Sequence, residues 1–132
     1  MTTVRTAACS CGQLTATVSV EPVRISICHC LACQRRTGSV FGAQARFPRD
    51  SVDIRGDSTA YVRVSDDGNE VTFRFCPVCG ATLAYVMQGL EEFIAIPVGA
   101  FADPQFPAPF VSVYEERRHA WVGLPDDIEH FP

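Results

Sequence analysis

The sequence contains no lysine, and all eleven of its cationic residues are arginine. These arginines are scattered along the chain and are outnumbered by fifteen acidic residues, which gives a formal net charge of −4. Most nucleic-acid-binding proteins need a concentrated basic surface to engage phosphates. We therefore expect no role in DNA or RNA binding.

Long apolar runs are also missing. No stretch reaches the roughly 18 apolar residues that a membrane-spanning helix needs. The segment Met1–Ala8 lacks the apolar core of a signal peptide. We therefore expect a cytoplasmic protein that does not bind a membrane.

No linker rich in Pro, Gly or Ser divides the 132 residues, and we find no low-complexity tract. The length is typical of one domain. Hydrophobic residues make up 47% of the chain, which is enough for a core. We expect a single folded domain over residues 1–132, one small enough to gain stability from bound metal.

Strand patterns dominate the sequence. Apolar residues alternate with polar ones through Gln13–Val20, the period-two pattern of a half-buried strand. Runs of β-branched and aromatic residues predict further strands at Val40–Phe47, Thr59–Val64, Val71–Phe75, Thr82–Met87, Phe93–Val98 and Val111–Tyr114. The turn signal at Asp66–Asn69 joins two of these strands as a hairpin. The sequence thus predicts a mainly β, antiparallel fold.

Helix is expected only as a turn at Leu31–Arg36, because no window sustains a 3.6-residue period. The proline-rich segment Asp103–Pro109 cannot form a regular hydrogen-bonded ladder, so it predicts a surface loop. We therefore expect little helix and short connections between the strands.

The seven cysteines are clustered, and their odd number excludes complete disulfide pairing. In a reducing compartment such clusters indicate metal binding or catalysis. Cys76 and Cys79 are separated by two residues and followed by a glycine, a spacing that directs two sulfurs at one metal ion. Cys9 and Cys11 are also followed by a glycine, so the two pairs predict a four-thiolate zinc site.

The remaining cysteines, Cys28, Cys30 and Cys33, lie within six residues and have no fourth cysteine. Three thiolates on zinc leave one coordination position open, as in catalytic zinc sites. We therefore predict a closed structural site and an open catalytic site.

Other groupings fit the same residues. A histidine can close the second site, and the candidates are His29, His119 and His130. Alternatively, Cys9 and Cys11 can share a metal with the second cluster, or all seven thiols can be free. The spacing of the pairs favours metal over free thiols.

The cysteine motifs resemble those of the glutathione-dependent formaldehyde-activating enzyme (GFA) family, which includes centromere protein V. The resemblance rests on three motifs: Cys9-x-Cys11-Gly12, Cys28-His29-Cys30-x-x-Cys33-x-Arg35-x-Thr37-Gly38, and Phe75-Cys76-Pro77-x-Cys79-Gly80. It extends to Gly99, to Asp103 and to the tail Arg118-His119-Ala120-Trp121.

The resemblance implies a β-tent, a fold of small antiparallel sheets stapled by zinc. It implies that Cys9, Cys11, Cys76 and Cys79 bind structural zinc, and that Cys28, Cys30 and Cys33 bind catalytic zinc. The implied activity is a carbon–sulfur lyase reaction that joins a small thiol such as glutathione to formaldehyde or a similar aldehyde. A non-catalytic, zinc-stapled module that binds a protein is the alternative.

We assign substrate contacts first to Arg35, Thr37 and Gly38, with Arg36 as a second cation near an anionic zinc–thiolate site. Arg35 and Arg36 can equally be solvated surface residues. The resemblance departs at Ser112, where many relatives carry a histidine.

The aromatic residues Phe110, Tyr114 and Trp121 can close over a ligand. Side chains of this kind more often fill a core, so we expect them to be buried.

Overall fold

The computed structural model describes residues 3–132, so the first two residues of the expected domain and of Met1–Ala8 lie outside it. Strands make up most of the regular structure, and the α-helix of these residues is the short α1 (Leu31–Thr37). Three single-turn helices accompany it: η1 (Arg49–Ser51), η2 (Val98–Phe101) and η3 (Glu115–Arg117). The mainly β prediction is confirmed. None of the helices in residues 3–132 has the length and hydropathy to cross a membrane.

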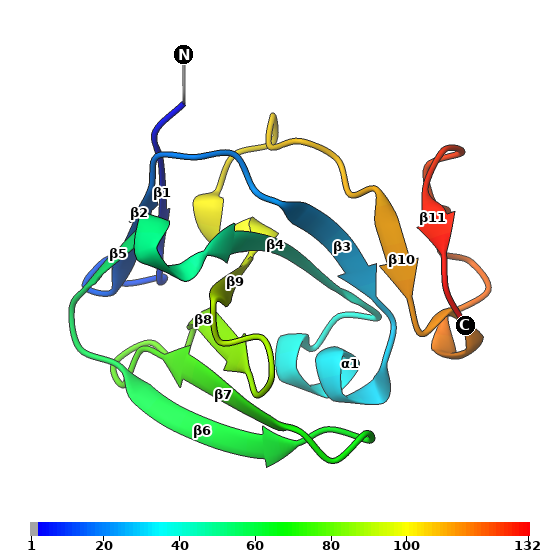
Figure 1. Cartoon of the computed structure of the whole chain (residues 1–132), viewed down its shortest axis with the longest axis horizontal. Helices are drawn as coiled ribbons and strands as arrows, with labels where there is room; N and C mark the ends of the chain where they lie inside the picture. Colours follow the sequence, from blue (N-terminus) through cyan, green and yellow to red (C-terminus); the bar gives the residue numbers. More distant parts are fainter. Residues whose placement is uncertain (1–2) are drawn as a thin grey trace.

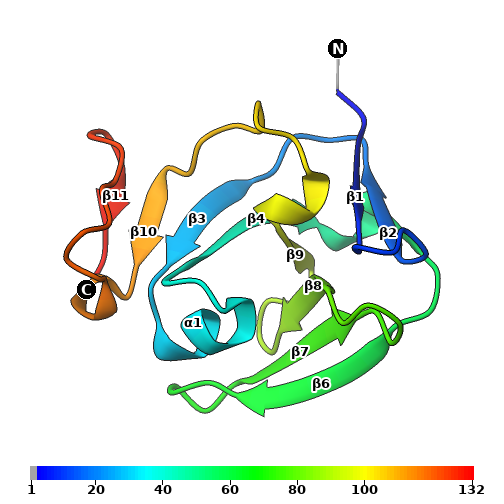
Figure 2. The same ribbon diagram turned by 180° about the vertical axis from the view of Figure 1, so that it is seen from behind.

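The strands of the described residues form two sheets. The three-stranded sheet has the antiparallel order β1 (Arg5–Ala8), β2 (Thr15–Val18), β5 (Val52–Arg55). The eight-stranded sheet has the order β11 (Glu129–His130), β10 (Val111–Val113), β3 (Arg24–Cys28), β4 (Gly42–Pro48), β9 (Phe93–Pro97), β8 (Thr82–Met87), β7 (Glu70–Phe75), β6 (Thr59–Val64). In Figures 1 and 2 the three-stranded sheet and the β10–β11 pair lie at opposite ends of the molecule.

The pairing is antiparallel except at one end of the larger sheet, where β10 runs parallel to both β3 and β11. Antiparallel neighbours can be joined by tight turns, whereas parallel neighbours need a long connection. The chain between Cys28 and Val111, which includes α1 and the six strands β4 to β9, provides that connection for β3 and β10.

The larger sheet is strongly curved. Figure 1 shows β3 and β4 lying across from β6 and β7, with α1 between them at the open side. The hydrophobic core lies on the other face of this sheet, where Ala45 and Phe47 of β4 pack with Leu14, Ala16 and Val18 around β2. Because side chains alternate along a strand, Gln44 and Arg46 of β4 point away from this core. The concave face therefore keeps polar residues that the core cannot accept.

Candidate functional site

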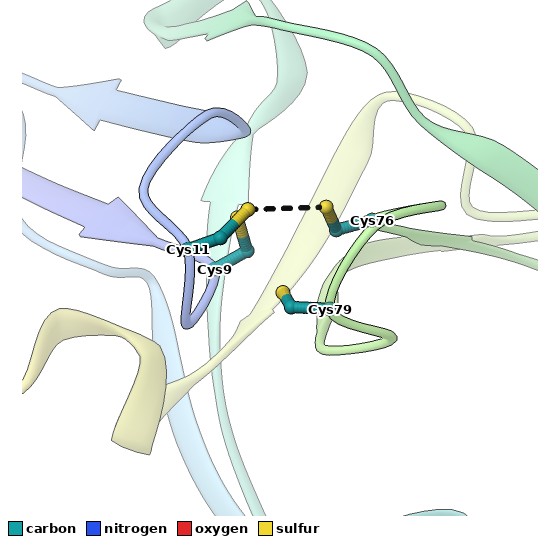
Figure 3. Close-up of side chains that lie close together, drawn as sticks. All are labelled: Cys9, Cys11, Cys76 and Cys79. Atoms are coloured by element: carbon teal, nitrogen blue, oxygen red, sulfur yellow. Dashed lines mark hydrogen bonds between the residues drawn. The ribbon is translucent and has the colours of Figure 1, made fainter.

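The first cysteine cluster joins the two sheets. Cys9 and Cys11 lie in the turn that follows β1, and Cys76 and Cys79 lie in the turn between β7 and β8. Their four sulfur atoms lie within 4.8 Å of one another. Figure 3 shows both pairs directing their side chains toward one point. The pairing of Cys9 and Cys11 with Cys76 and Cys79 thus follows from the fold.

The spacing of these sulfurs fits a zinc ion. Cys11 Sγ lies 3.6 Å from Cys9 Sγ and 3.7 Å from Cys76 Sγ. Four sulfurs at about 2.3 Å from one ion in tetrahedral geometry are roughly 3.8 Å apart, whereas a disulfide brings two sulfurs to about 2.0 Å. All seven cysteines are free. The cluster has the donor set and the spacing of a structural zinc site.

Hydrogen bonds support the thiolate charge of this cluster. Leu14 N donates to Cys9 Sγ at 3.3 Å, and Val78 N donates to Cys76 Sγ at 3.4 Å. Gln13 Nε2 also donates to Cys76 Sγ, at 3.0 Å. Donors of this kind orient metal ligands and stabilise their charged form. They come from the same turns that carry the cysteines.

The second cluster forms where β3 meets α1. Cys28 ends β3, Cys30 is the N-cap of α1, and Cys33 lies on the buried side of its first turn. The three sulfurs lie within 4.8 Å of one another. The backbone N–H of Cys33 donates to Cys30 Sγ at 3.3 Å, as a side-chain cap does. The sulfur of Cys30 therefore both caps the helix and belongs to the cysteine cluster.

The three thiols share a proton network. Hydrogen bonds from Cys28 and Cys33 lower the pKa of Cys30 to about 2. Hydrogen bonding to Cys30 and Cys33, together with burial, raises the pKa of Cys28. Three sulfurs this close together suit a ligand set for a soft cation.

A cavity of about 420 Å³ opens beside this second cluster, on the concave face of the larger sheet. Cys28, Cys30 and Cys33 lie in its wall. Four arginines and four aromatic residues also line it: Arg24, Arg46, Arg63, Arg117, Phe73, Tyr85, Phe93 and Tyr114. None of the four cysteines of the first cluster lines it. The second cluster therefore faces a cavity, whereas Cys11 and Cys79 of the first cluster are exposed outside it.

Comparison with known proteins identifies the family. The sequence profile described as "Glutathione-dependent formaldehyde-activating enzyme" matches residues 4–117.

The chain belongs to this family.

The fold is also similar to the crystal structure of a Rhodobacter sphaeroides protein from a structural genomics programme, with a TM-score of 0.58 and 18% identity. That similarity covers 96% of this chain and 99% of the other. At this identity the likeness concerns the fold alone. No curated protein sequence matches the chain.

The GFA-family motif residues outside the cysteines have local structural roles in this chain. Thr37 Oγ1 donates to the carbonyl oxygen of Cys33 at 2.8 Å, and Gly38 ends α1 in the left-handed conformation with φ of 72°. Arg35, Thr37 and Gly38 do not line the cavity. Their contact with a substrate stays a prediction.

Arg36 lies closer to the cluster. Its guanidinium stacks over Phe73 at 5.4 Å and over Tyr85 at 5.5 Å. A Cβ added to Gly42 would lie 3.2 Å from Arg36 Nη2 and 3.5 Å from Cys33 Cβ. Gly42 thus leaves room for this cation next to Cys33.

The histidines do not join the second cluster within residues 3–132. His29 is buried, and its Nε2 lies 3.0 Å from the hydroxyl of buried Ser112. His119 Nε2 contacts Gln34 Oε1, and His130 Nδ1 contacts Glu115 Oε2. Ser112 is thus the partner of the histidine that lies between two of the cysteines.

The expectation that the aromatic residues of the tail fill a core is wrong for Trp121 and Phe110. Trp121 is 74% exposed and Phe110 is 47% exposed. Trp121 follows η3 in a segment of turns, where its only ring neighbour in the described residues is His119. Tyr114 does not fill a core either, because it is 36% exposed and lines the cavity. The turns of this segment provide no neighbouring helix or sheet against which such large rings can pack.

The residues that sequence reasoning missed are the cavity arginines Arg24, Arg46 and Arg63. They come from β3, β4 and β6, which are far apart in the sequence. The signal for β3 is present in Arg24–Cys28, where polar residues alternate with Ile25 and Ile27. That alternation could have placed Arg24, Ser26 and Cys28 on one face.

Proposed function

We propose that this protein is a carbon–sulfur lyase that reversibly adds a small thiol to formaldehyde or a related aldehyde. The observation that carries the proposal is the position of Cys28, Cys30 and Cys33 in the wall of the cavity. Membership of the GFA family supports the reaction class, and its description names glutathione and formaldehyde. Glutathione or a similar thiol is then the first substrate.

The two clusters take different roles in this proposal. A structural zinc ion would be held by the four sulfurs of Cys9, Cys11, Cys76 and Cys79, which satisfy its usual ligand number. A second zinc ion would be held by Cys28, Cys30 and Cys33, which supply one ligand fewer and so leave access for a substrate thiol. When bound there, zinc lowers the pKa of an incoming thiol so that the thiolate is available near neutral pH.

The cavity residues provide the electrostatic setting. Besides the hydrogen bonds from Cys28 and Cys33, the positive charge of Arg63 lowers the pKa of Cys30. Arg36, which stacks over Phe73 and Tyr85, adds a second cation next to Cys33. Two cations offset the negative charge that three thiolates and an anionic substrate bring together. The aromatic wall limits the water around them.

In the proposed reaction the substrate sulfur forms a bond to the aldehyde carbon, and the π electrons of the carbonyl move to its oxygen. The thiol proton is released to water, and a general acid adds a proton to the carbonyl oxygen and is then reprotonated from water, giving a hydroxymethyl thioether. We assign the second proton to the hydroxyl of Tyr114. Tyr114 lines the cavity, and burial, together with nearby negative charges that include Cys28 and Cys30, raises its pKa. The phenol therefore stays protonated and able to donate.

The backbone of Tyr114 favours this role. Its φ of 57° lies in the left-handed region, which non-glycine residues rarely adopt. This conformation reverses the chain between β10 and η3 and so directs the ring to the cavity. Local backbone strain of this kind is concentrated at functional sites.

The test of the proposed function is a turnover screen of the zinc-loaded protein with several thiols, each with and without formaldehyde. Product formation that is lost in Cys30→Ser, while the fold is kept, supports the lyase. Metal analysis distinguishes the lyase from the alternative, a zinc-stapled module that binds a protein, because such a module needs no open zinc site. Two zinc ions that are equally resistant to a chelator, together with no turnover, would favour that module.

A further inference from the structure

The floor of the cavity is ordered along two strands. Cys28, Ser26 and Arg24 of β3 lie opposite Gly42, Gln44 and Arg46 of β4 in the antiparallel register. Side chains two residues apart share one face of a strand. Along the floor, the side chains therefore change from the sulfur of Cys28, through the neutral polar groups of Ser26 and Gln44, to the guanidinium groups of Arg24 and Arg46. At about 3.3 Å per residue, the Cα atoms of Cys28 and Arg24 are roughly 13 Å apart.

The arginine end of the floor carries unbalanced positive charge. Arg24 and Arg46 are direct cross-strand partners, and neither forms a salt bridge within residues 3–132. Arg24 Nε is buried without a hydrogen-bond partner. Burial, and then the charge of Arg24, lower the pKa of Arg46, with only a partial offset from Glu92. Like charges placed directly opposite each other destabilise a sheet, so an anion bound here relieves the repulsion.

The middle of the floor has an open hydrogen-bonding position. Gln44 is 8% exposed, and its Nε2 donates to Ser26 Oγ at 2.8 Å. Its Oε1 has no partner among the described residues. A buried carbonyl oxygen without a partner is costly, and an N–H group of a bound molecule satisfies it.

The cavity also contains carboxylates. Asp66 and Asp67, in the turn between β6 and β7, line the cavity. Their charges, together with those of Cys28 and Cys30, raise the pKa of Tyr114. Charges of both signs therefore lie near the sulfurs, where Arg63 acts on Cys30, whereas Arg24 and Arg46 form a pair of positive charges at the other end of the floor.

We propose that Arg24 and Arg46 bind the carboxylate of an extended thiol substrate, whose sulfur lies at the cysteine cluster at the other end of the cavity. Two arginine forks match the planar carboxylate, which they hold through charge-assisted hydrogen bonds. The substrate class is an acid long enough to span the floor. A thiol whose carboxylate is next to its sulfur cannot reach both ends. This assignment deepens the proposed function and rests on it for the position of the sulfur.

The test measures binding to the zinc-loaded protein by isothermal titration calorimetry. The probes are mercaptohexanoate, the neutral mercaptohexanol of equal length, and the short acid mercaptoacetate. Mercaptohexanoate should bind at least about tenfold more tightly than the other two, because one charge-assisted pair contributes roughly a factor of ten or more. Equal affinities for the acid and the alcohol would overturn the proposal.

Variants of the two arginines test whether they cause the preference for the acid. Arg24→Met and Arg46→Met should each remove most of the preference for the acid while changing the affinity for mercaptohexanol less than about twofold. Arg46→Lys keeps the charge without the fork and should retain part of the preference. Arg74→Met removes an exposed arginine of β7 that does not line the cavity, so it serves as the matched control. A preference unchanged in both pocket variants would refute the assignment.

The experiments distinguish a failure of the proposed function from a failure of the anion site. If no thiol gives turnover with formaldehyde but mercaptohexanoate binds in an arginine-dependent way, the lyase assignment is wrong and the anion site stands. If turnover occurs with the same KM for the acid and the alcohol in the wild type and both variants, the lyase stands and the anion site is wrong. Thermal unfolding of each variant shows whether the fold is kept.

Discussion

The side chain of Gln13 links the sulfur of Cys76 to the turn between β5 and β6. Its Nε2 donates to Cys76 Sγ at 3.0 Å and to the carbonyl oxygen of Asp57 at 2.8 Å, and its Oε1 accepts from Asp57 N at 2.9 Å. One amide therefore holds a metal-ligand candidate in place and ties together two segments that are distant in the sequence. Sequence motifs centred on cysteine give no indication of this residue.

Gln13→Leu should destabilise the fold by about 1–3 kcal/mol, because it leaves Cys76 Sγ and the polar backbone groups of Asp57 without their partner. It should also release zinc from the four-cysteine site faster, since supporting hydrogen bonds stabilise metal ligands. Thermal unfolding and the rate of zinc transfer to a coloured chelator measure the two effects. An unchanged transfer rate would show that the amide acts on the turn alone.

Gly56→Ala should also disturb the contact with Gln13, in this case through the backbone. Gly56 has φ of +102°, and a Cβ there would lie 2.0 Å from the carbonyl oxygen of Gln13. The chain must shift, so we expect a loss of about 2–4 kcal/mol in the free energy of unfolding. Gly68→Ala is the control, because Gly68 has φ of +89° but nothing within 4 Å. It should cost only about 1–2 kcal/mol. Equal losses in urea denaturation would contradict the steric argument.

Cys76→Ser and Cys30→Ser should have opposite consequences. Loss of the four-cysteine site removes a staple between the two sheets, and metal-binding energy at structural zinc sites is folding energy. Cys76→Ser should therefore abolish or strongly weaken the cooperative thermal transition. Cys30→Ser should keep the far-UV circular dichroism spectrum and lose one equivalent of zinc. If both variants unfold alike, the division into structural and open sites is wrong.

Tyr114→Phe should lower kcat for thiol addition to formaldehyde about 10²-fold or more, since a positioned general acid contributes roughly 10²–10⁴-fold. KM should change little, because the ring and its position in the cavity wall are retained. Tyr61→Phe is the matched control, as Tyr61 is 59% exposed and does not line the cavity. Steady-state kinetics with saturating thiol decides the assignment, and an unaltered kcat would remove Tyr114 from the mechanism.

Much of the fold was predictable because strand signals are local. The expected strands at Thr59–Val64 and Thr82–Met87 coincide with β6 and β8, and the expected helical turn is α1. The expected strand at Gln13–Val20 is shorter in the structure, since the turn bonds Cys9 N to Leu14 O and Gly12 N to Cys9 O hold its first residues. The short strands β1, β5 and β11 gave too few residues for a visible period.

The sequence by itself determined the three local cysteine motifs, because ligands within each motif are separated by one or two residues and a local turn suffices to bring them together. Tertiary structure alone decided which pairs share a site, as Cys9 and Cys76 meet only when the two sheets pack. It also decided what surrounds the open cluster. Arg24, Arg46 and Arg63 reach the cavity because the larger sheet curves, and curvature depends on strand order and twist across the whole sheet, which no local pattern encodes.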